Sequence, residues 1–277
     1  MTHSATQQRK QRRLFRKALL IPAEHGSWPW LLVPYFVGLG VSGQWSWALL
    51  PTLVGGLSAF LLRQPATAWL RVRQGRGRRS DLSLAAGWTI VLLLVGLVCL
   101  GLLLYMGRST LLWLLPPLGV ILVAYLAVAQ INRASVRSLW MEIAGAAGLA
   151  AMATAAYVAA GAPLDALAWA LWLIMALQNL LGVLYVRQRI ADTREREMSR
   201  RLVLSAHLLG VAALVMLTVA LELPRLLWLP FLAFLLRAAW AVTTPRPVPN
   251  MKRFGFTEVG VEIIGGLWII ASFAFQL

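Results

Sequence analysis

Apolar segments of about twenty residues follow one another along the chain, and they constrain its fold more than any other feature. Segments such as 85–106 and 202–220 are long enough to cross the roughly 30 Å of bilayer hydrocarbon as a helix. Only helices and closed barrels satisfy the backbone there, and the strands of a barrel would alternate in polarity, which these segments do not. The sequence therefore predicts an all-α polytopic transmembrane helical bundle.

Composition excludes the alternative of a water-soluble fold. Hydrophobic residues make up 60% of the 277 positions and charged residues only 13%, whereas a soluble domain carries roughly a quarter charged residues. Too few polar side chains remain to cover a water-exposed surface.

Nine spans account for the apolar segments. They cover about 28–41, 46–63, 85–106, 110–129, 139–160, 167–186, 202–220, 225–242 and 257–275. Residues 1–21 form a basic interfacial segment, and residues 22–277 form one transmembrane domain. We expect Ser27 to be the N-cap of the first span. Span 139–160 is rich in Gly and Ala, which allow close helix packing, so we place it in the middle of the bundle.

The loops between these spans are strongly basic on one side only. The stretch from Arg63 to Asp81 and the Pro-rich stretch 243–256 are both expected to be loops. If the N-terminus is inside, Arg108 and Arg225 are the only Lys or Arg residues on the outer side of the nine spans. This distribution predicts a cytoplasmic N-terminus and an external C-terminus. The net charge of +16 therefore indicates the bilayer as partner and not nucleic acid.

Ionisable groups near the cytoplasmic ends of the spans are the candidates for function, because such groups are costly at membrane depth. They are Glu24, His25, Arg63, Arg137, Glu142, Arg187, Arg189, Asp192, His207, Arg237, Glu258 and Glu262. This one-sided set of both signs fits the mouth of a cavity that opens to the cytoplasm. It equally fits ordinary anchoring of helix ends, with Arg side chains reaching the headgroups.

Anchoring explains the arginines better than the acids. Glu258 and Glu262 are four residues apart and share a helix face, and Glu142 lies one turn inside its span. A carboxylate there must pair with a cation or be protonated. An interhelical salt bridge to Arg63, Arg187 or Arg237 and a functional role are both open readings. We expect His207, Gln178 and Asn179 chiefly to form hydrogen bonds between helices.

A cluster of Glu24, His25 and Gly26 precedes the first span and supplies a candidate acid and base. No metal signature surrounds it, since the chain has three His and no HExxH motif. We therefore expect no metal site and no cofactor.

Several short motifs resemble those of one known family. PAEHGSW at 22–28, the Arg63-Gln64-Pro65 end of span two, YVR at 185–187 and FGFTE at 254–258 are similar to the YwiC-like family of bacterial membrane proteins. The resemblance runs nearly end to end and implies a multi-pass protein of the bacterial inner membrane. It implies no particular activity.

A more distant resemblance is to the architecture of UbiA-type prenyltransferases, with nine helices and cytoplasmic segments after spans two and six. Those enzymes hold Mg²⁺ and a prenyl diphosphate with Asp-rich motifs in these segments. Here no acid lies between His25 and Ser80, and Arg63, Arg71 and Arg73 stand there instead. Asp192 and Glu195 alone do not make the Mg²⁺ clamp, whereas Arg can bind phosphate directly.

Four functions follow as hypotheses. In the first, a UbiA-like fold binds an anionic or isoprenoid lipid through polar residues at the cytoplasmic side. The ligand-binding residues of this hypothesis are Arg63, Arg71, Arg187, Arg189, Asp192, Arg237 and Glu258.

The other three hypotheses use different residues or none. A metal-independent lipid transferase would draw its acid–base groups from Glu24, His25, Glu142 and Glu262. A transporter would carry protons on Glu262 and His207, although no inverted repeat is apparent. A non-catalytic assembly partner would need no buried acids, so Glu142 and Glu262 argue against it.

Overall fold

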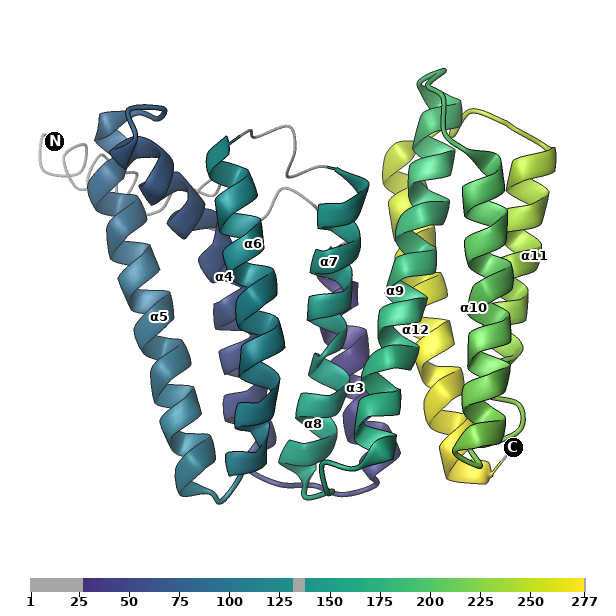
Figure 1. Cartoon of the computed structure of the whole chain (residues 1–277), viewed down its shortest axis with the longest axis horizontal. Coiled ribbons are helices and arrows are strands. Elements are labelled where there is room, and N and C mark those ends of the chain that lie inside the picture. The colour runs from purple at the N-terminus through teal and green to yellow at the C-terminus, as the bar shows by residue number, and fades with distance from the viewer. Residues whose placement is uncertain (1–26, 132–137, 277) are drawn as a thin grey trace, which may run out of the picture.

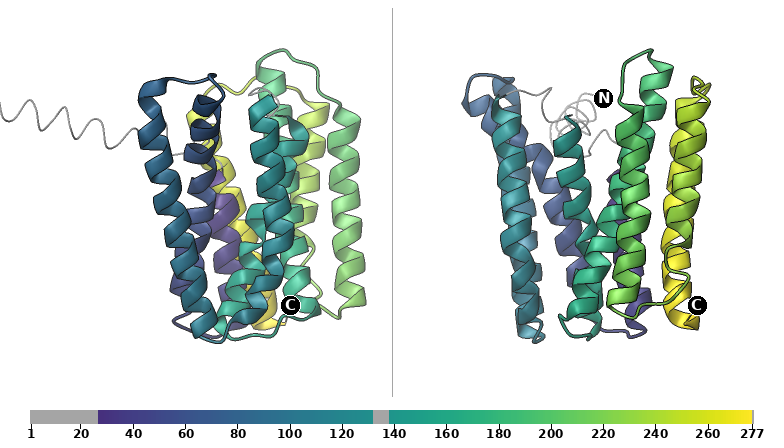
Figure 2. Two further views of the ribbon diagram at one scale, coloured as in Figure 1. Left: turned by 60° about the vertical axis from the view of Figure 1, so that its left-hand side comes forward. Right: turned by 45° about the vertical axis from the view of Figure 1, so that its right-hand side comes forward.

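A computed structural model describes residues 27–131 and 138–276, and within those ranges it contains helices and no strands. The helices are α3 (Pro29–Ser42), α4 (Leu49–Arg73), α5 (Leu82–Tyr105), α6 (Leu115–Ile131), α7 (Leu139–Ala150), α8 (Met152–Ala160), α9 (Ala166–Thr193), α10 (Arg200–Ala220), α11 (Leu229–Thr243) and α12 (Met251–Phe275). Two 3-10 turns, η2 (Arg79–Asp81) and η3 (Ser109–Leu114), precede α5 and α6. All of these helices run between the same two ends of the molecule (Figures 1 and 2).

The two ends differ in charge. We call the end at which α4 and α9 finish the basic end, at the top of Figure 1, and the opposite end the far end. Arg73 closes α4, and Arg194 follows α9, at the basic end. Arg108 and Arg225 lie in connections at the far end, between α5 and η3 and between α10 and α11.

Within residues 27–131 and 138–276, six segments are long and apolar enough to cross a membrane. They are Arg79–Tyr105, Ser109–Ile131, Leu139–Ala160 (α7 with α8), Ala166–Thr193, Arg200–Ala220 and Met251–Phe275. Helices α3 and α11 are apolar but shorter, and α4 contains Arg63, Arg71 and Arg73. The predicted all-α membrane fold is confirmed, whereas the number of nine spans stays a prediction.

The helices fall into two lateral groups with a central column between them. In Figure 1, α4, α5 and α6 stand on one side and α9–α12 on the other, with α3, α7 and α8 between them. In the most apolar part of Leu139–Ala160, 67% of the residues are buried, against 11% in Arg79–Tyr105. The Gly- and Ala-rich span therefore does lie in the middle of the bundle, as its small side chains predicted.

Glycines on α3 set the closest approach in that central column. A Cβ atom on Gly38 would lie 1.9 Å from the backbone oxygen of Ala153 in α8. On the other side of α3, a Cβ on Gly266 of α12 would lie 2.5 Å from Cγ1 of Val33. Helix α3 therefore packs with its backbone almost in contact with its neighbours, which only small residues allow.

The expected loop from Arg63 to Asp81 is wrong over most of its length. Helix α4 continues through Arg71 to Arg73, with Pro65 inside it. Leu, Ala, Gln and Arg, which make up most of this stretch, are good helix formers, and the Arg71 side chain bonds to α6, donating from Nη1 to the backbone oxygen of Ala129 at 3.2 Å. The helix thus extends past the apolar layer.

Two other expected boundaries are also wrong. Helix α12 begins at Met251, inside the predicted Pro-rich loop, because Asn250 caps it by accepting a hydrogen bond from the Arg253 backbone N–H at 3.0 Å. Ser27 is not the N-cap of α3; Trp28 occupies that position and no side chain caps the helix. Trp28 already has helical backbone angles, and Pro29 follows it in the first turn.

We predict that Gly38→Ala lowers the free energy of unfolding by about 1–3 kcal/mol, because the new methyl group would overlap the α8 backbone. Gly101→Ala in α5 is the matched control, since a Cβ there meets nothing within 4 Å, and it should be neutral or slightly stabilising. Thermal unfolding of the two variants in the same detergent measures the difference. Equal midpoints would contradict the packing described for α3.

Candidate functional site

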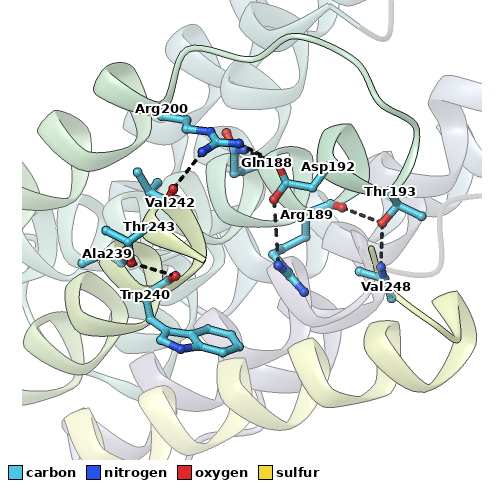
Figure 3. Close-up of polar contacts among 10 residues, drawn as sticks. All are labelled: Gln188, Arg189, Asp192, Thr193, Arg200, Ala239, Trp240, Val242, Thr243 and Val248. Atoms are coloured by element: carbon cyan, nitrogen blue, oxygen red, sulfur yellow. Dashed lines mark hydrogen bonds and ion pairs between the residues drawn. The ribbon is translucent and has the colours of Figure 1, made fainter. Parts of the chain in front are cut away.

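A cluster of polar side chains joins α9 to α10 at the basic end (Figure 3). Asp192 lies at its centre, where Oδ1 accepts a hydrogen bond from Gln188 Nε2 at 2.9 Å. The same Oδ1 lies 3.8 Å from Nη2 of Arg200, and Oδ2 lies 3.8 Å from Nη1 of Arg189. Two guanidinium groups from two helices therefore face one carboxylate, whose side chain is only 7% exposed.

Backbone contacts hold the surrounding segments around this cluster. Arg200 Nη1 donates to the backbone oxygen of Val242, near the end of α11, at 3.1 Å. Thr193 Oγ1 accepts from the Val248 N–H at 2.9 Å and donates to the Arg189 backbone oxygen at 2.8 Å (Figure 3). The end of α9 is thereby fixed to the loop between α11 and α12.

A pocket of about 580 Å³ opens beside the cluster. It is lined by Gln188, Asp192 and the α9–α10 loop from Glu195 to Arg200. Asp192 and Arg200 thus belong both to the cluster and to the pocket wall. The Arg200 side chain is 47% exposed, so the pocket communicates with the surface at the basic end.

Arg189 is the least satisfied cation of this region. The residue is only 8% exposed, yet its Nε and Nη1 atoms have no hydrogen-bond acceptor among the residues that the structure describes. Its separation of 3.8 Å from Asp192 is an ion pair that is too long for a hydrogen bond. A buried guanidinium is costly when two of its nitrogen atoms donate no hydrogen bond. An anion from outside the chain would remove this cost by accepting from them.

A second ion pair lies one layer deeper, between α11 and α12. Nη1 of Arg237 lies 3.0 Å from both carboxylate oxygens of Glu258. The guanidinium also lies over the ring of Tyr185 in α9, 3.8 Å from its centroid. This contact combines charge pairing with a cation–π interaction and ties three helices together.

Glu262 lies deepest, one turn beyond Glu258 along α12. It is 7% exposed, and its backbone oxygen accepts a hydrogen bond from Gln178 Nε2 at 3.1 Å. Gly182 of α9 faces the carboxylate, since a Cβ there would lie 3.8 Å from Oε2, in ordinary van der Waals contact. Nearby, Nδ1 of His207 lies 2.7 Å from the backbone oxygen of its own helix at Val203, so this contact forms within α10 and not between helices.

These layers share one face of α9, which the sequence reasoning did not recognise. Gln178, Gly182, Tyr185, Arg189 and Asp192 are separated by four, three, four and three residues, the spacing of a helix face that packs against partner helices. Tyr185 and Gln188 could have been found from such spacing. Arg200 could not, because its place beside Asp192 depends on how α10 packs against α9.

The predicted lipid-binding arginines do not form one cluster. Arg187 lies on another face of α9, with Nη1 3.1 Å from Oε2 of Glu142 in α7. Arg63 lies over an aromatic ring of its own helix, 4.7 Å from the centroid, and Arg71 bonds to α6. The arginines are thus divided between the α4–α6 group and two faces of α9.

The predicted interhelical salt bridges form for two of the three acids. Glu142 pairs with Arg187 and Glu258 with Arg237, whereas Glu262 forms no salt bridge within the described part of the chain. Glu24, His25 and Arg137 lie outside the described residues. Within 27–131 and 138–276, no three His, Cys, Asp or Glu side chains gather in a way that could hold a metal ion.

Asn179 acts between helices, as its position predicted. It is fully buried, and its Nδ2 donates to the backbone oxygens of Trp30 in α3 and Ala146 in α7, at 3.1 and 3.0 Å. One amide therefore holds α3, α7 and α9 together.

We predict that Asn179→Leu lowers the free energy of unfolding by about 1–2 kcal/mol, through the loss of two interhelical hydrogen bonds. Gln130→Leu is the control, because both polar atoms of the Gln130 side chain are buried without a partner, so this change should be neutral or stabilising. Unfolding in mixed detergent micelles compares the two variants. A larger loss for Gln130→Leu would show that the hydrogen-bond assignment is wrong.

Comparison with known proteins finds one family to which part of the chain is similar. The family model of the YwiC-like protein matches residues 21–157, which include α3 to α7 and most of α8. No curated protein matches significantly. No solved structure does so either, and a UbiA-like arrangement of the helices stays a prediction. Over residues 21–157 the chain is similar to the YwiC-like family, in agreement with the resemblance of its motifs.

Proposed function

We propose that this multi-pass membrane protein binds an anionic lipid at its basic end, through a phosphate group held by Arg189 and Arg200. The observation that carries the proposal is the buried Arg189 guanidinium, whose Nε and Nη1 find no acceptor in the described part of the chain. Phosphate oxygens accept such N–H groups in a bidentate manner.

The surroundings of Arg189 fit a phosphate-bearing ligand. Asp192 is held by Gln188 and lies 3.8 Å from each arginine, so it positions both guanidinium groups without occupying their N–H groups. The adjoining pocket of about 580 Å³ adds Arg196 to its wall and reaches the surface. A headgroup could therefore enter at the basic end while its acyl or isoprenoid chains stay in the bilayer.

The remaining alternatives find less support. For a metal-independent transferase, Glu142 is engaged by Arg187, and Glu24 and His25 lie outside the described residues. The described geometry does not assemble an acid–base pair around a substrate position. Binding without catalysis is therefore the more economical reading.

We propose further that the basic end faces the cytoplasm of a bacterial cell and that the far end faces outward. The bias of Lys and Arg toward the basic end supports this orientation. At the basic end the arginines would also meet the anionic lipid surface that attracts basic residues.

The orientation predicts which residues a membrane-impermeant thiol reagent reaches in intact cells. In a Cys99→Ser background, Gln44→Cys at the far end should be labelled from outside, and Gln74→Cys at the basic end only after lysis. Both positions are exposed glutamines outside the helices, so they form a matched pair. Labelling of Gln74→Cys alone in intact cells would reverse the orientation.

The lipid site is tested by native mass spectrometry of the purified full chain with added phosphatidylglycerol. We expect Arg189→Gln to weaken binding about tenfold or more, the loss expected for charge-assisted hydrogen bonds. Arg200→Gln should weaken it less, because its guanidinium is half exposed. Arg225→Gln at the far end is the control and should bind like the unaltered protein.

Two further ligands distinguish the source of the phosphate. Inorganic phosphate tests for a free anion, and a prenyl diphosphate tests for an isoprenoid carrier. Binding of phosphatidylglycerol or the prenyl diphosphate that depends on Arg189 supports a lipid site. Binding that is unchanged in Arg189→Gln, or limited to inorganic phosphate, would overturn the proposal.

A further inference from the structure

Two carboxyl groups and one arginine share the interior between α9, α11 and α12. Glu258 and Glu262 stand one turn apart on α12, and Arg237 reaches them from α11. Arg237 pairs with Glu258 through Nη1, while its Nε has no hydrogen-bond acceptor. One positive charge thus lies near two acids, and because Arg237 pairs with Glu258, the second acid forms no salt bridge with a described residue.

Glu262 is that second acid. It is only 7% exposed, and its Oε1 atom has no hydrogen-bond donor within 27–131 and 138–276. The Gln178 side chain is oriented by donating from Nε2 to the Glu262 backbone oxygen, so the amide oxygen of Gln178 points elsewhere, and it too has no donor. A carboxylate without a counter-charge in an apolar interior is far more costly than a carboxylic acid.

The charged groups around this position are few. From α9, Tyr185 and Arg189 act on the neighbouring Glu258. From α10, His207 lies near Arg237, with its ring held at Val203. Helix α3, which also packs on α12, contains no Asp, Glu, His, Lys or Arg. Arg237 is therefore the cation for which an ionised Glu262 would compete.

We infer that Glu262 is a proton-binding site within the membrane-spanning interior, in exchange with the basic end. In the arrangement described, the Glu262 carboxyl holds the proton and Arg237 pairs with Glu258. When the O–H bond of Glu262 breaks, the proton leaves to water at the basic end and the carboxylate attracts Arg237 away from Glu258. This function does not require lipid binding at Arg189.

A polar route connects Glu262 with the basic end. Glu258, Tyr185 and Arg189 follow in order along α12 and α9 toward Asp192, at the wall of the open pocket. Each of these groups touches or electrostatically influences the next. A bound metal cation is less suited to Glu262, because hard cations such as Ca²⁺ require about six or more oxygen ligands.

Infrared difference spectroscopy of the full chain in lipid nanodiscs tests this inference. The unaltered protein should show the carbonyl band of a buried carboxylic acid at neutral pH, shifted in D₂O because its proton exchanges. Glu262→Gln, which keeps the shape of the side chain, should lose this band. Glu222→Gln, at an exposed acid of the far end, is the control and should keep it.

Further variants test the competition for Arg237. Glu258→Gln frees Arg237 to pair with an ionised Glu262, so the band should be lost, and Glu258→Gln combined with Arg237→Gln should restore it. A band that persists in Glu262→Gln, or one that is unchanged in Glu258→Gln, would overturn the inference. Loss of the band on addition of Na⁺ at constant pH would assign the site to a metal cation and would also overturn it.

Discussion

A charged side chain that enters an apolar layer must find its counter-charge on another helix, and this requirement governs the α9–α12 half of the molecule. Helix α9 carries Arg189 and Asp192 on the face that meets α10. Helices α11 and α12 bring Arg237 and Glu258 together beneath them. These pairings decide which faces of the four helices meet, because an unpaired charge would cost more than apolar packing returns.

The same requirement separates two arginines that are neighbours in sequence. Arg187 points to α7 and pairs with Glu142, while Arg189 pairs with Asp192 of its own helix, which lines the pocket. The first pair links the central column to α9, and the second arginine keeps N–H groups unused. One of the two arginines thus pairs between helices, and the other is the one that we propose binds a phosphate group.

Much of the architecture could be predicted from sequence. Long apolar segments predicted helices, and the small residues of 139–160 predicted a central span, since both follow from the solvent that surrounds the chain. The helix ends were predicted less well: α4 continues to Arg73 and α12 begins at Met251. The sequence reasoning ended each span where the apolar residues end. The contact of Arg71 with α6 lets α4 continue past that point, and the cap at Asn250 starts α12 before it.

The sequence predicted which types of residue form the candidate site better than it predicted which of them lie together. Acids and arginines at one end of the spans were visible in the sequence, and two of the expected salt bridges exist. The sequence by itself determined that the chain is a helical membrane protein with its charges gathered at one end, because hydrophobicity and charge act locally. Only the tertiary structure decided that Glu258 pairs with Arg237 while Glu262 forms no salt bridge with any described residue, because pairing depends on which helices meet and at what depth.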